Sequence, residues 1–115
     1  MTEDIVKNDP TLTDFRKKVY LALLTVPEGN VVTYAMLGRM IDCKCAQAIG
    51  QALKNNPYAP DVPCHRVIRT DLTIGGFHGE TSGKHIQRKL KLLAEEGVAF
   101  DEDMRLANPE NLLLK

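Results

Sequence analysis

The spacing of apolar residues predicts a first helix between about residues 11 and 25. Apolar side chains recur there at intervals of three and four residues, which is typical of one buried helix face. This stripe consists of Phe15, Val19, Ala22, Leu23 and Val26. Thr11 is a suitable N-cap, and Asp14 would lie in the first turn, where the helix dipole favours an acid. The turn sequence Pro-Glu-Gly-Asn at 27–30 would end the helix.

Two shorter helices joined by a tight turn follow. Val31 and Val32 predict a very short strand, and Thr33 can cap a helix over residues 34–41. The next helix is predicted over residues 45–55. Its inner face carries Ala46, Ile49 and Leu53. Two short helices with a tight turn between them, after a longer helix, are the pattern of a helix-turn-helix.

The second half of the chain predicts a hairpin and one more helix. Proline-rich residues 55–63 form a loop, and residues 65–77 have the pattern of a strand, a polar turn and a second strand. A last helix is expected over residues 81–98, with Gly97 as its C-terminal stop. Its apolar stripe consists of Ile86, Leu90 and Leu93. A short terminal hairpin can follow within 98–115.

These elements predict a mainly α single domain with a small β hairpin, similar to a winged helix-turn-helix, over residues 1–115. Residues 1–10 are polar, and we expect them to be flexible. A chain of 115 residues lies in the common size range of one domain. No apolar run approaches the roughly 18 residues of a membrane helix, and the N-terminus lacks a secretory signal. We therefore expect a soluble, intracellular protein that has no membrane partner.

Cysteine number and charge narrow the possible functions. The chain has three cysteines, an odd number that argues against a closed disulfide framework. Cys43 and Cys45 form a C-x-C pair, but no second pair completes a zinc site, so no metal is expected. The net charge is zero, yet residues 36–91 hold nine basic and four acidic residues, a net charge of +5. An anionic partner is therefore expected for the middle of the chain.

The segment Asp-Val-Pro-Cys-His-Arg-Val at 61–67 carries the candidate chemistry. A free thiol with a pKa of ~8.5 is mostly protonated at neutral pH, so a nucleophilic Cys64 needs a base. His65 can be that base, directly or through a water, if a carboxylate orients its other ring nitrogen. Adjacent side chains of an extended segment point to opposite faces, so a direct contact requires a turn. The possible carboxylates are Asp71, Glu80, Glu95 and Glu96, and the sequence does not choose among them.

Five short motifs together resemble a known family. They are VVTY at 31–34, NNP at 55–57, VPCHRV at 62–67, IGGF at 74–77 and KLLAEEG at 91–97. In this order they resemble the DNA-binding domain of the methylated-DNA–protein-cysteine methyltransferases, the O6-alkylguanine-DNA alkyltransferases. The resemblance covers residues 13–97, which is most of the chain.

The resemblance implies direct DNA repair. Members of the family bind duplex DNA through the minor groove, flip the O6-alkylguanine out of the helix and move the alkyl group onto a cysteine. Flipping is necessary because the alkylated atom cannot be reached inside the base stack. The thioether product is permanent, so each molecule acts once and needs no cofactor. The resemblance also implies a monomer without the family's frequent N-terminal accessory domain, located in the cytoplasm and nucleoid, or in the nucleus of a eukaryote.

The resemblance also implies roles for individual residues. Cys64 would be the alkyl acceptor, His65 the water-coupled base, and Glu96 the carboxylate that orients His65. The residues expected at the substrate are Tyr34, Asn56, Val67, Gly75, Phe77 and His78. The residues expected at the DNA are Thr33, Lys44, Cys45, Ala46, Gln47, Ala48, Gly50, Lys54 and Arg66.

The sequence departs from the family pattern at three positions. Gln47 stands where the family usually has an arginine that enters the base stack, so flipping is expected to be weaker. Phe77 and His78 replace a more usual tyrosine and serine, which would change the pocket for the alkyl group. Residues 76–98 and the tail beyond them are similar to alkyltransferase-like proteins, which bind the same lesions but have another residue, often tryptophan, in place of the cysteine.

Three alternative functions therefore stay open. The first is a lesion-binding protein of the alkyltransferase-like kind, in which Cys64 reacts slowly. The second is a Cys-His hydrolase, although the sequence has no evident oxyanion-hole motif. The third is a winged-helix regulator that binds specific DNA sequences and in which Cys64 is inert.

Overall fold

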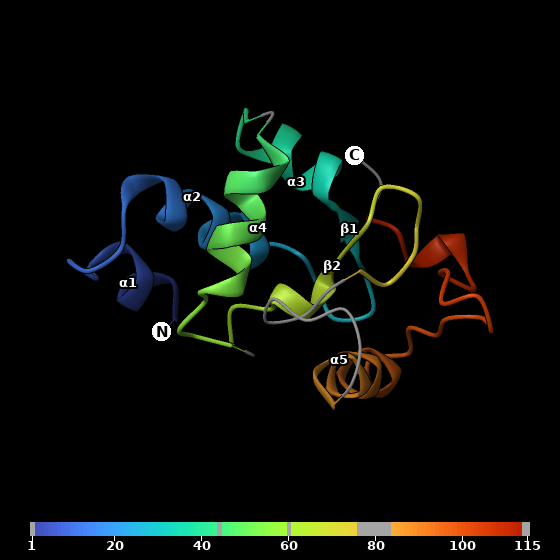
Figure 1. The fold of residues 1–115 in the computed structure, drawn as a ribbon. Coiled ribbons are helices and arrows are strands. Elements are labelled where there is room, and N and C mark those ends of the chain that lie inside the picture. The colour runs from blue at the N-terminus through green and yellow to red at the C-terminus, as the bar shows by residue number, and fades with distance from the viewer. Residues whose placement is uncertain (1, 44, 60, 76–83, 114–115) are drawn as a thin grey trace.

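A computed structural model of the chain describes residues 2–43, 45–59, 61–75 and 84–113. Helices make up most of this part, and a two-stranded sheet accompanies them, which confirms the predicted class. The elements are α1 (Thr2–Lys7), α2 (Asp14–Leu23), β1 (Val32–Thr33), α3 (Tyr34–Met40), α4 (Ala46–Lys54), η1 (Cys64–Arg66), β2 (Val67–Ile68), α5 (Lys84–Glu95) and η2 (Pro109–Asn111). Figure 1 shows α1 to α4 gathered at one end of the molecule, with α5 apart from them and against η1. None of the helices in these residues has the length and apolar character needed to cross a membrane.

The first long helix, α2, begins two residues later than the sequence predicted. Its N-cap is Thr13, whose Oγ1 accepts a hydrogen bond from the Arg16 N–H at 3.1 Å. The predicted cap, Thr11, instead donates through its N–H and its hydroxyl to Asp9 Oδ1, at 2.8 and 2.6 Å. Because the aspartate forms a local turn with Thr11, this threonine is not available to cap the helix.

The N-terminal residues include a helix that the sequence analysis did not predict, and the expectation that residues 1–10 are flexible stays a prediction. Residues 2–7 form α1, which packs against α2. The Val6 side chain is fully buried in the main core. The Tyr58 hydroxyl, from the loop before η1, donates a hydrogen bond to the Asp9 carboxylate and anchors the chain after α1. One buried apolar residue in a six-residue helix gives no periodic pattern, so the sequence could not reveal it.

The helix-turn-helix prediction is confirmed by α3 and α4. Thr33 caps α3, with its Oγ1 accepting from the Met36 N–H at 3.1 Å, as the sequence predicted. After α3 the chain turns back and passes very close to this helix. There the Cys43 N–H donates to the Gly38 carbonyl at 2.8 Å. A Cβ at Gly38 would lie within 3.0 Å of the Cys43 carbonyl oxygen, so only glycine fits there. Ile49 faces the core from α4, with 1% of its surface exposed.

The small sheet is parallel, and the predicted hairpin over residues 65–77 does not form in the described residues. In the observed register, β1 pairs with β2 so that Val32 lies opposite Val67. After β2 the chain turns at once through Leu72, whose φ is +73°. The following residue, Thr73, pairs with Arg105 of the C-terminal segment. Both strands are buried, which is typical of a parallel pair.

The C-terminal part follows the predicted pattern more closely. On α5, Ile86 and Leu93 are buried, and Gly97 has a φ of +84°, which suits its predicted position after the helix. The predicted terminal hairpin is present as an antiparallel bridge between Phe100 and Leu106. Because α5 ends at Glu95, Glu96 lies just beyond the helix, where its carboxylate contacts residues of η1.

Candidate active site around Cys64

Cys64 and His65 begin the short 3-10 turn η1 and are both buried. The Arg66 N–H donates to the Pro63 carbonyl at 3.0 Å, and the Val67 N–H donates to the Cys64 carbonyl. Only 5% of the Cys64 surface and 2% of the His65 surface are exposed. The backbone therefore makes the turn that a joint action of thiol and imidazole requires.

Asn56 fixes the loop that leads into this turn. Its Nδ2 donates to the Val62 carbonyl at 2.8 Å, and its Oδ1 accepts from the Tyr58 N–H at 2.9 Å. The side chain is 7% exposed. Because one amide binds the loop at two points, the position of Cys64 is tied to the end of α4.

A distant carboxylate completes the site. Glu96 Oε2 lies 2.9 Å from His65 Nε2. The Arg66 guanidinium binds the same carboxylate, with Nε 2.9 Å from Oε1 and Nη2 2.8 Å from Oε2. Its third nitrogen, Nη1, donates to the Val26 carbonyl at 2.7 Å. Glu80 lies outside the described residues; of the other three carboxylates that the sequence left open, the structure brings Glu96 to the imidazole.

The surroundings of His65 keep the imidazole neutral. Burial lowers the pKa of His65 below its usual value, while the hydrogen bond and the charge of Glu96 act in the opposite direction. The other ring nitrogen, Nδ1, is buried and has no hydrogen-bond partner among the described residues. With its proton on Nε2, towards Glu96, a neutral His65 presents the Nδ1 lone pair as an acceptor.

The two groups that flank His65 also have shifted pKa values. Burial raises the pKa of the Cys64 thiol, and the hydrogen bond from Asn56 and the charge of Lys89 reduce this effect. Burial alone would raise the pKa of Glu96, but hydrogen bonds from Arg66 and His65 outweigh it and lower the pKa. At neutral pH the site therefore holds a protonated thiol, a neutral imidazole and an ionised carboxylate. Such a thiol reacts only when a base removes its proton.

Lys89, on α5, is a buried part of the site that the sequence analysis did not single out. Its Nζ donates to the Val67 carbonyl at 2.8 Å and to the Ile74 carbonyl at 2.6 Å. Its surface is 1% exposed, and burial lowers its pKa to about 7. The sequence held a signal for it, because Lys89 follows Ile86 by three residues and precedes Leu93 by four, on the buried helix face.

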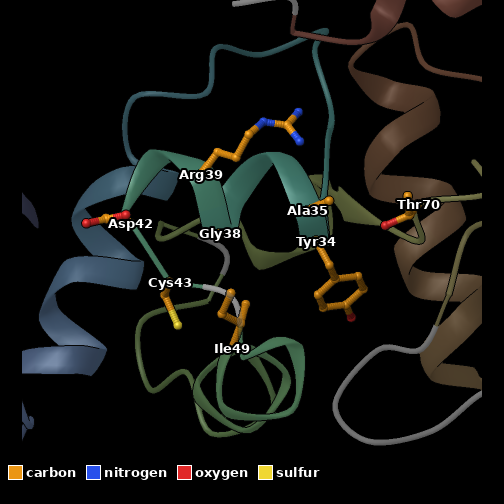
Figure 2. A pocket seen from close by; sticks show the side chains of 8 residues that line it. All are labelled: Tyr34, Ala35, Gly38, Arg39, Asp42, Cys43, Ile49 and Thr70. Atoms are coloured by element: carbon orange, nitrogen blue, oxygen red, sulfur yellow. The ribbon is translucent and has the colours of Figure 1, made fainter.

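A groove lies beside α3. Its volume is about 350 Å³. The residues that line it are Tyr34, Ala35, Gly38, Arg39, Asp42, Cys43, Ile49 and Thr70. Figure 2 shows the Tyr34 ring and the Ile49 side chain on the same side of α3, whereas Arg39 points away. Burial raises the pKa of the Tyr34 hydroxyl, and the charge of Arg69 acts in the opposite direction.

Comparison with known proteins identifies the family. Residues 14–98 match the family model of the 6-O-methylguanine DNA methyltransferase DNA-binding domain. The chain belongs to this family. The methylated-DNA–protein-cysteine methyltransferase of Mycobacterium tuberculosis is 37% identical over 107 residues, which are 92% of this chain and 62% of that protein. The chain therefore spans about three fifths of the length of this curated relative.

Two solved structures show the range of the family fold. The O6-methylguanine-DNA methyltransferase of Pyrococcus kodakaraensis is 41% identical with a TM-score of 0.66, over 76% of this chain and 48% of that one. Atl1 of S. pombe, solved in complex with damaged DNA containing O6-carboxymethylguanine, is 30% identical with a TM-score of 0.74. That match covers 90% of this chain and 98% of Atl1.

The structure exposes several of the residues that the methyltransferase resemblance assigns to DNA. Cys45, Gln47 and Lys54 are exposed on or next to α4, and Ala48 and Gly50 are half-buried. A Cβ at Gly50 would meet no atom within 4 Å, so this part of the helix surface is open. Of Ala46, the structure describes the backbone at the start of α4. These DNA contacts stay predictions.

The remaining predicted residues are placed differently. Thr33 is 5% exposed and its hydroxyl caps α3, which leaves it little surface for DNA. Val67 is buried in β2, and Gly75 has a φ of +72°, directly after the Ile74 carbonyl that Lys89 binds. Their substrate contacts stay predictions, as does a DNA contact of Arg66. Lys44, Phe77 and His78 lie outside the described residues. Within the described part of the chain, no cluster of three or more His, Cys, Asp or Glu could hold a metal ion.

Proposed function

We propose that the chain repairs DNA directly, by moving an alkyl group from O6 of guanine onto Cys64. The observation that carries this proposal is the buried His65 ring, whose Nε2 is held by Glu96 while Nδ1 has no partner among the described residues. A neutral imidazole in this orientation can take the proton of the adjacent thiol. Membership of the methyltransferase family supports the class of reaction.

In the proposed reaction, His65 Nδ1 accepts the Cys64 proton, directly or through one water, while Sγ attacks the alkyl carbon. The S–C bond forms as the C–O6 bond breaks, and the electron pair of that bond stays on the guanine. The guanine then takes up a proton, so the net proton transfer is from thiol to guanine. Glu96 stabilises the imidazolium that forms in between. Because the thioether is permanent, each molecule would act once.

We infer that the substrate is an O6-alkylguanine in duplex DNA, bound along α4 and the groove beside α3. Exposed Gln47 and Lys54 on α4 support this placement. The groove supports it as well, because Tyr34, which the resemblance assigns to the substrate, lines it (Figure 2). The base must leave the stack to reach a buried thiol. We expect Tyr34 to meet the flipped nucleotide there.

A second candidate function is lesion binding without efficient transfer. The match to nearly the whole length of Atl1, a protein solved with damaged DNA, favours it. Gln47 favours it too, because an uncharged side chain would replace the flipped base less well than the family's usual arginine. Against it stands Cys64, which is followed by a His65 ring bound to the Glu96 carboxylate.

The deciding experiment is intact-protein mass spectrometry after incubation with a duplex that contains one O6-methylguanine. We expect a mass gain of one methyl group in place of a hydrogen, located at Cys64 by peptide mapping and absent from Cys64→Ser. Glu96→Gln should slow the gain strongly, whereas Glu95→Gln, at an exposed neighbouring position, should not.

Each other outcome has a defined meaning. Selective binding of the lesion without mass gain would replace the repair proposal by the lesion-binding one. Neither binding nor gain would contradict both. If Gln47 limits flipping, Gln47→Arg should accelerate transfer from duplex DNA while leaving transfer from a free O6-alkylguanine base unchanged.

A further inference from the structure

Arg66 and His65 share one carboxylate oxygen of Glu96. Oε2 lies 2.9 Å from His65 Nε2 and 2.8 Å from Arg66 Nη2, while Oε1 accepts from Arg66 Nε at 2.9 Å. Arg66 Nη1 donates to the Val26 carbonyl at 2.7 Å, just after α2. The side chains of Arg66 and Glu96 are 15% and 10% exposed. The guanidinium is therefore held at three points, with its fork matched to both carboxylate oxygens.

This sharing decides which form of the imidazole the site favours. A buried carboxylate paired with a histidine alone favours the imidazolium. An imidazolium has no free lone pair and cannot accept a thiol proton. Here Arg66 already balances the Glu96 charge, and it also repels a second positive charge on His65. The free-energy cost of burying a charged imidazolium therefore outweighs the attraction of Glu96, and the neutral ring is favoured.

We propose that Arg66 is a positioning residue for alkyl transfer: it fixes Glu96 so that His65 stays a neutral imidazole, with Nε2–H towards the carboxylate and Nδ1 ready to accept the Cys64 proton. In this role Arg66 acts through Glu96 and not through DNA. The inference rests on the proposed function for the identity of the reaction, but the state of the His65 ring can be measured without DNA.

Two other charges near His65 also act on its titration, Lys89 in the same direction as Arg66 and Glu96 in the opposite direction. Glu96 attracts a proton to the ring, and Arg66 and Lys89 repel it. Cys64, beside the ring, is an uncharged thiol at neutral pH because burial raises its pKa. Since Lys89 and Glu96 stay in place when Arg66 is replaced, a change in the His65 titration reports on Arg66.

The experiment compares two substitutions of Arg66 with a matched control. Arg66→Gln keeps N–H donors but removes the charge, whereas Arg66→Lys keeps the charge but cannot bind both carboxylate oxygens in a fork. Arg88→Gln removes the same charge from an exposed position on α5. The ring nitrogens are followed by ¹⁵N NMR as the pH is changed, and His65 is assigned by its loss in His65→Gln.

We expect the unmodified chain to hold a neutral His65 at pH 7, with the proton on Nε2. In Arg66→Gln the pKa of His65 should rise by about one to two units, because the unbalanced Glu96 then favours the imidazolium. Arg66→Lys should shift it less, and Arg88→Gln should leave it unchanged. The transfer rate of Arg66→Gln should fall about tenfold near pH 6.5 and recover towards pH 8.5, in proportion to neutral imidazole. A purely structural defect would lower the rate by the same factor at every pH.

Two results would overturn the inference. One is a folded Arg66→Gln chain in which His65 titrates as in the unmodified protein. The other needs no variant and therefore applies even if Arg66→Gln does not fold: a His65 that is charged at pH 7, or that has its proton on Nδ1, in the unmodified chain. If His65 shifts as expected but no chain transfers an alkyl group, Arg66 still sets the protonation state of His65, and the proposed function fails.

Discussion

Replacing Lys89 by methionine should change the stability of the protein in a strongly pH-dependent way. Methionine has a similar length, so the substitution removes the charge and the N–H donors with little change in volume. The Lys89 ammonium is 1% exposed and donates to the Val67 and Ile74 carbonyls. Burial disfavours its charged form, whereas in the unfolded chain the same amine is fully hydrated.

The magnitude follows from the difference between the two pKa values of Lys89. Burial lowers its pKa to about 7 in the folded protein. An unfolded lysine titrates near 10.4, so between these limits the unfolded chain binds the extra proton. The free energy of unfolding therefore rises with pH in this window, and falls again as the pH drops towards 7. From pH 7 to pH 9 the Lys89 contribution should increase by about 2 kcal/mol, a contribution that Lys89→Met lacks.

The assay is urea unfolding of both chains at pH 7 and pH 9, followed by circular dichroism in the presence of a reducing agent. The measured quantity is the loss of unfolding free energy caused by Lys89→Met, and we expect this loss to be larger at pH 9. Lys91→Met is the matched control, because Lys91 is exposed on the same helix. Its effect should be small and the same at both pH values.

The refuting result is equally specific. If Lys89→Met destabilises the protein by the same amount at pH 7 and pH 9, the amine keeps an ordinary pKa in the folded state. Lys89 would then be buried as a charged ammonium group. Its positive charge would persist near Cys64 over the whole physiological pH range.

Three further substitutions test the fold. Gly38→Ala should destabilise the protein by roughly 1–3 kcal/mol in thermal unfolding, because its Cβ would collide with the Cys43 carbonyl; an unchanged melting temperature would contradict this close approach. Thr13→Ala should cost about 1 kcal/mol in urea unfolding through loss of the α2 cap, and no loss would mean that another residue caps the helix. Tyr20→Phe should cost roughly 1–3 kcal/mol, because the buried hydroxyl donates to the Ala52 carbonyl at 2.6 Å; a neutral effect in the same assay would contradict that hydrogen bond.

Local patterns in the sequence were sufficient to predict the main helices. The apolar stripes of α2, α4 and α5, the Thr33 cap and the Gly97 stop depend on neighbours within a few residues, so they can be recognised without a fold. The errors arose where a distant contact decided the outcome. Val6 of α1, for example, is buried in a core that other elements build.

The pairing of the two strands is a second feature that a distant contact decided and that the sequence pattern did not predict. Residues 65–77 alternate like a hairpin, but the backbone hydrogen bonds of β2 are taken by β1, more than thirty residues earlier in the chain. The next segment pairs with the C-terminal tail instead. Strand pairing depends on which backbone edges the helices bring together, and a pattern within one segment cannot specify that.

At the site, the sequence by itself determined the adjacent thiol and imidazole of Cys64 and His65 and the rigid proline before them. The residues alone left the orienting carboxylate open, and the resemblance named Glu96. The tertiary structure decided that Glu96 meets His65, that Arg66 binds the same carboxylate, and that Lys89 is buried nearby. The reason is physical: reactivity and hydrogen-bonding capacity belong to each residue type, whereas pKa shifts and shared hydrogen bonds arise only when folding removes water and brings distant groups together.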